Sequence, residues 1–220
     1  MSDNRPYAVS RYRNNVDYTP EYVEGPYEIP YIKPEQYVPV KEYIPFNSAG
    51  STKYGRDKKG IHFFIHDYQF EGLWSNREKY KSMLQQYKVV LTPDFSPYMD
   101  WPLMVQLWNH YRKHLIGAWM QEIGCLVYPT ITWSDERSLG WCFDGEPAHS
   151  TVCVSSVGVM KKKDDRLLFM RGYDRMLEVL EPTTILFYGS IPIECEGNIV
   201  EIETFQKKTY GKGGRISDKA

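Results

Sequence analysis

The chain contains 220 residues with a formal net charge of −1, and 42% of its residues are apolar. This apolar content is enough for one sizeable hydrophobic core and excludes a chain that is disordered throughout. The balanced charge provides no overall basic field of the kind that attracts nucleic acid. No stretch approaches the roughly 18 apolar residues of a membrane span, and the N-terminus has no apolar signal region, so we expect a cytoplasmic protein that does not enter a membrane.

The four cysteines are widely separated and form no CxxC pair. Cys125 and Cys153 lie inside apolar runs, where thiols are commonly buried. This spacing is typical of reduced thiols in a cytoplasmic protein rather than of a disulfide framework or a zinc site.

Residues 1–45 form an arm that is rich in tyrosine and proline. Prolines this dense disfavour both helices and central strands, so we expect an extended course. Tyrosine rings are large anchors that lose little entropy on ordering. The composition therefore favours a strap that lies on the protein's own core or on another subunit. A flexible tail with solvated tyrosines is the alternative.

Apolar runs and helical periodicities alternate along residues 46–205, which we expect to form a single domain. The expected strands are residues 61–70, 88–91, 125–133, 151–160 and 184–190. The expected helices begin at the capping box Ser75–Glu78, after the N-cap Asp100, and at Asp164 or Asp165. Strands that alternate with helices predict an α/β fold with a mainly parallel sheet of about five strands. Crossover helices connect the strands, and the sheet is either open and doubly wound or a partial barrel.

Two further segments follow the fifth strand. Residues 192–205 are expected to form a hairpin that turns at Gly197 and Asn198. Residues 206–220 form a basic tail that contains glycine. Such tails are typically solubility segments, and contact with phosphate groups is the alternative.

The helix predicted over residues 101–123 carries a polar cluster beside its apolar stripe. The cluster consists of His110, Arg112, Lys113 and His114. A charge cluster on a helix is usually a solvated surface, and we expect that role here, with ligand binding as the alternative.

The stretch VVLTPDFSPYMDWP, residues 89–102, organises the predicted site. Its first three residues are apolar and predict a strand that is buried on both faces. Pro93 lacks the N–H group that a strand ladder needs, so the strand should end there. Asp94 and Ser96 then lie beyond the carboxyl end of a strand, where α/β proteins bind ligands. The alternative is that Asp94 only stabilises the turn through its own side chain.

Several polar and aromatic side chains follow the ends of the other predicted strands. In a parallel sheet these ends share one edge, which gathers Asp67, Asp94, Trp133, Ser155 and Tyr188. Two carboxylates with hydroxyl groups and aromatic rings suit a divalent cation such as Mg²⁺, acid–base chemistry, or stacking on a sugar or base. The metal ligands would be Asp67 and Asp94, if the strand order makes them neighbours.

Established nucleotide-binding and hydrolase motifs are missing from the sequence. It contains neither GxxxxGK[ST] nor GxGxxG, and it has no G-x-S-x-G elbow. His62 and His66 would lie on one face of a strand, but about 13 Å apart, which is too far to share one ion. We expect them to be core or edge residues.

Five motifs together resemble a family of unknown function found in phages, plasmids and other bacterial mobile elements. They are HFFIHDYQFEGLW, LTPDFSPYMDWP, PTITWSD, VSSVGV and LFYGS, within residues 45–190. Family members usually have two acids where this chain has His66 and Asp67. The resemblance implies an intracellular bacterial or phage setting. It also implies a site that includes Asp67, Asp94, Phe95, Ser96, Trp133, Ser134, Tyr188 and Gly189.

These observations favour a protein that binds or acts on a nucleotide or nucleic acid through the acidic and aromatic strand ends, with Mg²⁺ as a candidate cofactor. The alternative is a non-catalytic accessory protein that engages a protein partner, or another copy of itself, through the tyrosine and proline arm. Chemistry on a carbohydrate or small metabolite is a weaker third option, because aromatic residues beside carboxylates are its only support.

Overall fold

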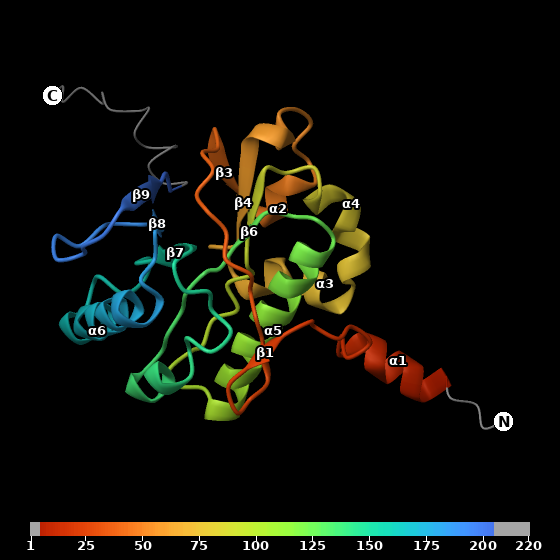
Figure 1. Cartoon of the computed structure of the whole chain (residues 1–220), viewed down its shortest axis with the longest axis horizontal. Coiled ribbons are helices and arrows are strands. Elements are labelled where there is room, and N and C mark those ends of the chain that lie inside the picture. Colours follow the sequence, from red (N-terminus) through yellow and green to blue (C-terminus); the bar gives the residue numbers. More distant parts are fainter. Residues whose placement is uncertain (1–4, 205–220) are drawn as a thin grey trace, which may run out of the picture.

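The computed structural model describes residues 5–204, and parallel β-strands form its centre (Figure 1). Four strands pair in the first parallel sheet, in the order β3 (Glu42–Pro45), β4 (Lys59–His62), β5 (Val89–Leu91) and β6 (Val127–Tyr128). Three strands pair in the second parallel sheet, in the order β7 (Thr151–Ser155), β8 (Thr184–Tyr188) and β9 (Ile199–Ile202). A parallel bridge between Thr130 and Cys153 connects the two sheets. The spatial order of the seven strands therefore follows their order in the chain.

The combined sheet is strongly curved. The rings of Phe64, which follows β4, and Tyr188, at the end of β8, stack with their centroids 4.5 Å apart. In a flat sheet, these strands would be separated by four spacings, about 19 Å. The curvature encloses a cluster of side chains from the inner face, made of Tyr43, Val89, Leu91, Tyr128, Cys153, Leu186, Tyr188 and Ile202. Consecutive parallel strands around a shared interior form a partial barrel, so this one of the two predicted architectures is the one observed.

Helices cover the outer face of the curved sheet (Figure 1). The α-helices after the first strand are α2 (Phe46–Ala49), α3 (Glu71–Ser75), α4 (Lys81–Leu84), α5 (Leu103–Glu122) and α6 (Lys163–Leu180). The 3-10 turns are η1 (Arg56–Lys58), η2 (Asp67–Gln69), η3 (Arg77–Tyr80) and η4 (Glu136–Gly140). Helices α3, α4 and α5 bury one apolar cluster against β4, β5 and β6. Helix α6 buries a second cluster against β7 and β8.

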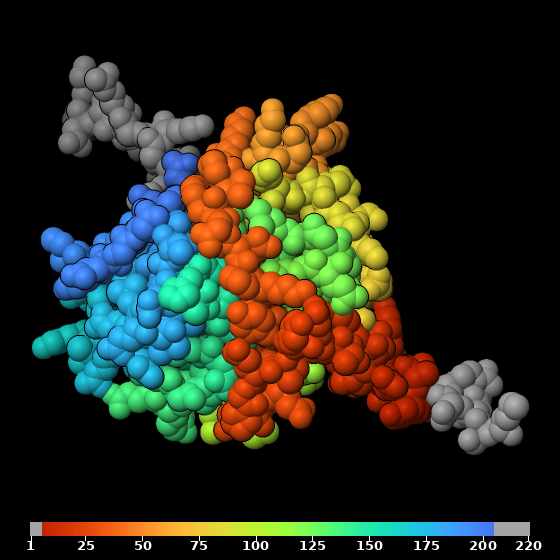
Figure 2. Space-filling model, viewed as in Figure 1, coloured from red at the N-terminus to blue at the C-terminus, as the bar shows by residue number. Residues whose placement is uncertain are grey.

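The N-terminal region is folded onto the protein itself. It contains helix α1 (Arg5–Arg13) and a small antiparallel pair, β1 (Val23–Glu24) with β2 (Ile29–Pro30). Residues 28–41 then run as an orange band between the green and blue parts of the molecule (Figure 2). Ile32 N donates to Gly145 O, and Thr151 N donates to Glu35 O. Residues 28–41, called the strap below, therefore lie on the core of their own chain.

Some predicted elements differ from the structure. Residues 5–13 are helical rather than extended, because Pro6 lies in the first turn, where a missing N–H group costs little. The strand predicted over residues 61–70 ends at His62, since Ile65 N donates to Phe63 O in a tight turn. The predicted C-terminal hairpin is wrong: β9 pairs in parallel with β8, because residues 189–198 cross back to the start of β8 without forming a strand.

The helix starts also differ from the predicted caps. Asn76, not Ser75, accepts the capping hydrogen bond from Lys79 N. Helix α5 begins after Pro102 without a side-chain cap from Asp100. Every cysteine is a free thiol, as predicted, and all but Cys195 are buried. No helix within residues 5–204 is long and apolar enough to cross a membrane. The predicted basic tail lies outside the described residues.

Candidate ligand-binding site

A cavity of about 420 Å³ opens beside the carboxyl ends of β5, β6 and β7. Its walls come from the segments that follow these strands and from the first turns of α6. The residues that line it are Asp94, Ser96, Pro97, Tyr98, Met99, Ile131, Thr132, Trp133, Ser134, Ser155, Val157, Gly158, Val159, Asp165, Leu168 and Phe169. This is the edge at which the sequence predicted a site, and the volume is within the range of small-molecule pockets.

Asp94 is placed in this cavity by the way β5 ends. Thr92 and Thr130 extend the pairing of β5 and β6 through two hydrogen bonds, Thr130 N to Thr92 Oγ1 and Thr130 Oγ1 to Thr92 O. Pro93 has no N–H group to continue the pairing, so the chain leaves the sheet at Asp94. Among residues 5–204, none donates a hydrogen bond to the half-buried Asp94 carboxylate. Asp94 therefore presents an unpartnered carboxylate to the cavity.

The electrostatic surroundings of Asp94 favour its protonated form. The pKa of the Asp94 carboxyl is raised from 3.8 to about 7, chiefly by burial and in addition by the nearby Asp67 carboxylate. The positive charge of Lys113 acts in the opposite direction. A carboxyl group with a pKa near neutrality exchanges protons under ordinary conditions and is a common feature of functional sites.

Asp67 holds the loop that carries Asp94. Its two carboxylate oxygens accept hydrogen bonds from Ser96 N, at 3.0 Å, and from Ser96 Oγ, at 3.2 Å. Asn109 of α5 holds the same loop, donating to Ser96 O at 2.8 Å. Burial raises the pKa of Asp67, while the bonds from Ser96 lower it. Asp67 lies behind Ser96 and does not line the cavity, so its main contact stabilises the loop.

An indole ring forms another part of the cavity wall. The ring of Trp133 packs against Phe169 of α6, with centroids 5.4 Å apart. Gly172 of α6 makes room for it, because a Cβ atom at that position would lie 2.2 Å from the indole ring. Ser134 Oγ donates to Gln106 Oε1 of α5. Trp133 and Ser134 are thus held between two helices.

The mouth of the cavity is apolar and exposed. Tyr98 and Met99 line it, and Tyr98 packs on Trp101 with ring centroids 4.6 Å apart. The side chains of Tyr98 and Trp101 are 42% and 40% exposed. Three exposed lysines, residues 161–163, follow the lining residue Val159 in the chain.

The structure brings most of the predicted site residues together. Asp94, Ser96, Trp133, Ser134 and Ser155 all line the cavity, and Asp67 is bonded to Ser96. The remaining predicted residues are elsewhere: Tyr188 is in the enclosed interior against Phe64 and His62, Phe95 is buried in the core, and Gly189 packs near Ser156. Tyr188 is the end of a strand, but its side chain points to the inner face of the barrel.

The face of α5 that was predicted to be solvated is buried. His110, Lys113 and His114 are 4%, 1% and 0% exposed. They are buried because the loop 141–150 and the strap pack against this face, and Glu146 pairs with Lys113 and His114. The i, i+4 spacing of the two histidines was the sequence signal that could have identified them as a cluster.

Comparisons with known proteins place the chain in a family. The family model DUF4417, described as a domain of unknown function, matches residues 21–206. The Gene 1 protein of Mycobacterium phage L5 is 38% identical over 167 residues, which cover 75% of this chain and 72% of the phage protein. The Gene 1 protein of Mycobacterium phage D29 is 34% identical over 193 residues, which cover 87% and 71% of the two chains. No solved structure matches. The predicted resemblance to a phage family is thus confirmed, and the chain belongs to the DUF4417 family.

Proposed function

We propose that the cavity binds a nucleobase, either of a free nucleotide or of an unpaired residue in a nucleic acid. The observation that carries this proposal is the Asp94 carboxylate, which faces a cavity and receives no hydrogen bond from the described residues. An unpartnered, partly buried acceptor is costly unless a ligand donates to it. Nucleobases present N–H donors along one edge and a flat apolar face, and Asp94 and Trp133 offer the matching pair.

The size and walls of the cavity support a flat ligand of this class. A volume of about 420 Å³ accommodates a base with part of its sugar. Aromatic side chains bind bases by stacking, with little dependence on sequence. Trp133 inside the cavity and the Tyr98–Trp101 pair at its mouth supply such surfaces.

The charges near the cavity fit a ligand with a phosphate group outside and a base inside. The lining contains two carboxylates, Asp94 and Asp165, and no lysine or arginine. The exposed lysines 161–163 follow the lining residues of the loop before α6. Phosphate groups are therefore expected over these lysines, where they remain solvated.

The proposed binding of a nucleobase does not require Mg²⁺, and the effect of Mg²⁺ on binding is measured separately. Asp67 and Asp94 are close enough for their charges to interact, but both oxygens of Asp67 accept bonds from Ser96. Of the two predicted metal ligands, Asp94 is therefore the one whose carboxylate is left for a magnesium ion.

Isothermal titration with the full chain tests the proposal. The probes are nucleoside monophosphates, a short single-stranded DNA and the matching RNA, each with and without Mg²⁺. We expect at least one probe to bind, and Asp94→Asn to weaken it about tenfold, because one carboxylate oxygen becomes an amide donor. Asp100→Asn, an exposed acid outside the cavity, is the matched control and should bind like the natural chain.

The comparison between probes distinguishes a free nucleotide from a nucleic acid. Replacing lysines 161–163 by glutamine should weaken the binding of the oligonucleotides more than that of the monophosphates. An oligonucleotide brings several phosphate groups near these lysines, and a monophosphate brings only one. The proposal is wrong if every probe fails to bind, or if Asp94→Asn and Asp100→Asn bind equally well.

A second candidate function is recognition of a protein partner by helix α1. This helix projects from the body of the molecule in Figure 1, and it exposes Tyr7, Val9 and Tyr12. We propose it as an interaction element, since residues 29–32, further along the same region, are packed on the core. Replacing these three residues by serine should leave the nucleotide titration unchanged and abolish any self-association measured by sedimentation. Unchanged sedimentation of an associated species would contradict a role of α1 in contacts between copies.

A further inference from the structure

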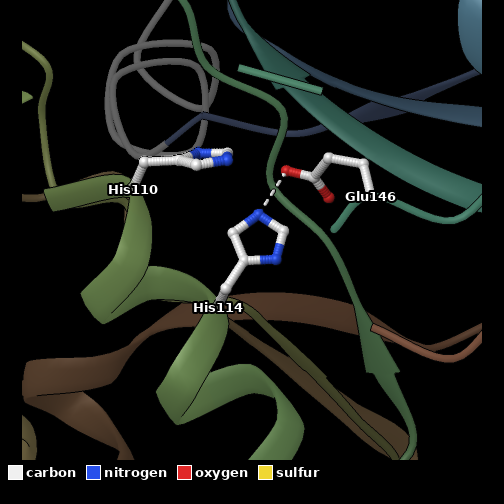
Figure 3. Close-up of side chains that lie close together, drawn as sticks. All are labelled: His110, His114 and Glu146. Atoms are coloured by element: carbon white, nitrogen blue, oxygen red, sulfur yellow. Dashed lines mark hydrogen bonds and ion pairs between the residues drawn. The ribbon is translucent and has the colours of Figure 1, made fainter. Parts of the chain in front are cut away.

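Figure 3 shows a cluster of two histidines and one glutamate, which are buried and do not line the cavity. His110 and His114 lie on successive turns of α5, and Glu146 comes from the loop before β7. One donor atom from each residue lies within 4.8 Å of the other two. All three side chains are at most 4% exposed.

Backbone carbonyl groups fix the outer nitrogen of each imidazole ring. His110 Nε2 is 3.0 Å from Asp144 O, and His114 Nδ1 is 2.9 Å from Pro30 O. A carbonyl oxygen only accepts hydrogen bonds, so both of these nitrogens carry protons. In the neutral rings, His110 Nδ1 and His114 Nε2 therefore carry lone pairs. Metal-binding histidines are typically oriented in this way, by an outer hydrogen bond to a carbonyl or carboxylate.

The contact between His114 and Glu146 then needs a cation. His114 Nε2 lies 3.0 Å from Glu146 Oε1, and two lone pairs at that distance repel each other. Either a second proton on His114 or a metal ion that accepts lone pairs from both residues removes the repulsion. Nitrogen and oxygen ligands of one zinc ion are about 3.3 Å apart in a tetrahedral site, which is close to the observed spacing. Glu146 Oε2 is buried and has no hydrogen-bond partner among the described residues.

The loop that carries Glu146 is built for a close approach. Gly145 has a φ of +76°, and a Cβ atom there would lie 2.7 Å from Pro30 O and 2.9 Å from His114 Nδ1. The strap holds the loop as well, through the bond from Ile32 N to Gly145 O at 2.9 Å. The cluster therefore joins helix α5, the loop before β7 and the strap.

We propose that His110, His114 and Glu146 bind one divalent transition-metal ion of the zinc class. Two imidazole nitrogens favour zinc or a neighbouring transition metal over magnesium or calcium. The site is fully buried and outside the cavity, so its role is to fasten the strap and the loop to α5. It is independent of the nucleobase proposal, because neither histidine nor Glu146 lines the cavity.

The positive charge of Lys113 lies beside the proposed metal site and gives a further test of it. Its Nζ donates to Glu146 Oε1 at 2.6 Å and to Thr130 O at 3.0 Å. The carboxylate can serve the lysine and the metal together, because Oε2 has no other partner. A buried positive charge beside the ion still lowers its affinity. Lys113→Met should therefore bind zinc about tenfold more tightly than the natural chain.

The test measures bound metal in the full chain. The protein is equilibrated with zinc chloride, passed through a desalting column, and analysed by mass spectrometry of its metal content. We expect about one zinc per chain in the natural protein and in His149→Gln, whose imidazole is exposed, and little in His110→Gln. Far-ultraviolet circular dichroism establishes that each variant is folded.

Two measurements on the natural chain make the test independent of the variants. Cobalt loading should give visible absorption bands that the metal-free chain lacks, and removal of metal with 1,10-phenanthroline should lower the melting temperature by roughly 5 °C. The proposal is overturned if the natural chain retains no zinc, or if phenanthroline leaves its melting temperature unchanged. Equal zinc retention by folded His110→Gln and His149→Gln would also overturn it.

Discussion

Asp94 is the residue on which the binding proposal depends, and its raised pKa has a consequence for stability. The pKa of the Asp94 carboxyl is about 7 in the folded protein, and it has the unperturbed value of 3.8 in the unfolded chain. The folded chain therefore holds its proton more tightly than the unfolded chain does. Through Asp94, the free energy of unfolding is highest below about pH 4, falls as the pH rises to about 7, and is then level.

Asp94→Asn removes this dependence and is our first prediction. At about pH 8, the variant should be more stable than the natural chain by about 2 kcal/mol, since partial solvation reduces the full value of the pKa shift. Near pH 4, the two free energies of unfolding should be equal. Urea unfolding at both pH values measures them. If the variant is less stable at about pH 8, Asp94 is a structural residue of the turn and not a free carboxylate.

At this scale, the sequence predicted the position of Asp94 but not its surroundings. Pro93 after an apolar run located the strand end, because a missing N–H group stops a ladder wherever it occurs. The link from Asp67 to Ser96 could not be predicted, since it joins residues 29 positions apart. Tyr188 was misplaced because the end of a strand determines which edge a residue reaches, while alternation determines the face on which its side chain lies.

At the scale of elements, the wall of the cavity depends on the fit between helix α6 and Trp133. Gly172→Ala should destabilise the protein by about 1–3 kcal/mol, because its Cβ atom would displace the indole ring. Higher helix propensity of alanine offsets only part of this cost. The same variant should weaken nucleobase binding, since Trp133 lines the cavity.

Gly140→Ala provides the control, because a Cβ atom there has no neighbour within 4 Å. Thermal unfolding and the titration described above should give natural values for this variant. If Gly172→Ala has natural stability and natural affinity, Trp133 does not depend on α6 for its position.

Strands and helices with strong apolar patterns were predicted from the sequence, and those that depend on other elements were not. Helix α5 has the apolar periodicity of a helix with one buried face. Strands β5, β7 and β8 have the continuous apolar runs of strands that are buried on both faces. The polar face of α5 was misread because its partners, the strap and the loop with Glu146, are distant in the chain. Strand β9 was misread because Gly197 and Asn198 resemble a hairpin turn, although they end a crossover.

For the whole molecule, the strap is expected to be essential and α1 dispensable. Deleting residues 2–13 should lower the melting temperature by less than about 5 °C, because α1 projects from the body. Deleting residues 2–41 should prevent folding. It removes Ile29 and Ile32, which are 1% and 0% exposed, together with the hydrogen bonds of the strap. Circular dichroism and sedimentation of both variants measure the outcome. A cooperative unfolding transition in the longer deletion would contradict the account.

The overall architecture was predicted only as one of two forms. A partial barrel and a doubly wound sheet contain the same alternation of strands and helices, so periodicity does not separate them. The strand order distinguishes them, and contacts such as Phe64 with Tyr188 show that the ordered strands curve around a shared interior.

Photo-crosslinking tests the central claim most directly, because it locates the bound base. The full chain is irradiated with 4-thiouridine monophosphate, and separately with a single-stranded RNA that contains one 4-thiouridine. Peptides are then identified by mass spectrometry. The account predicts adducts on residues 96–99 and 131–134 of the cavity, and their loss in Asp94→Asn but not in Asp100→Asn. Adducts confined to residues outside the cavity, or equal in both variants, would contradict it.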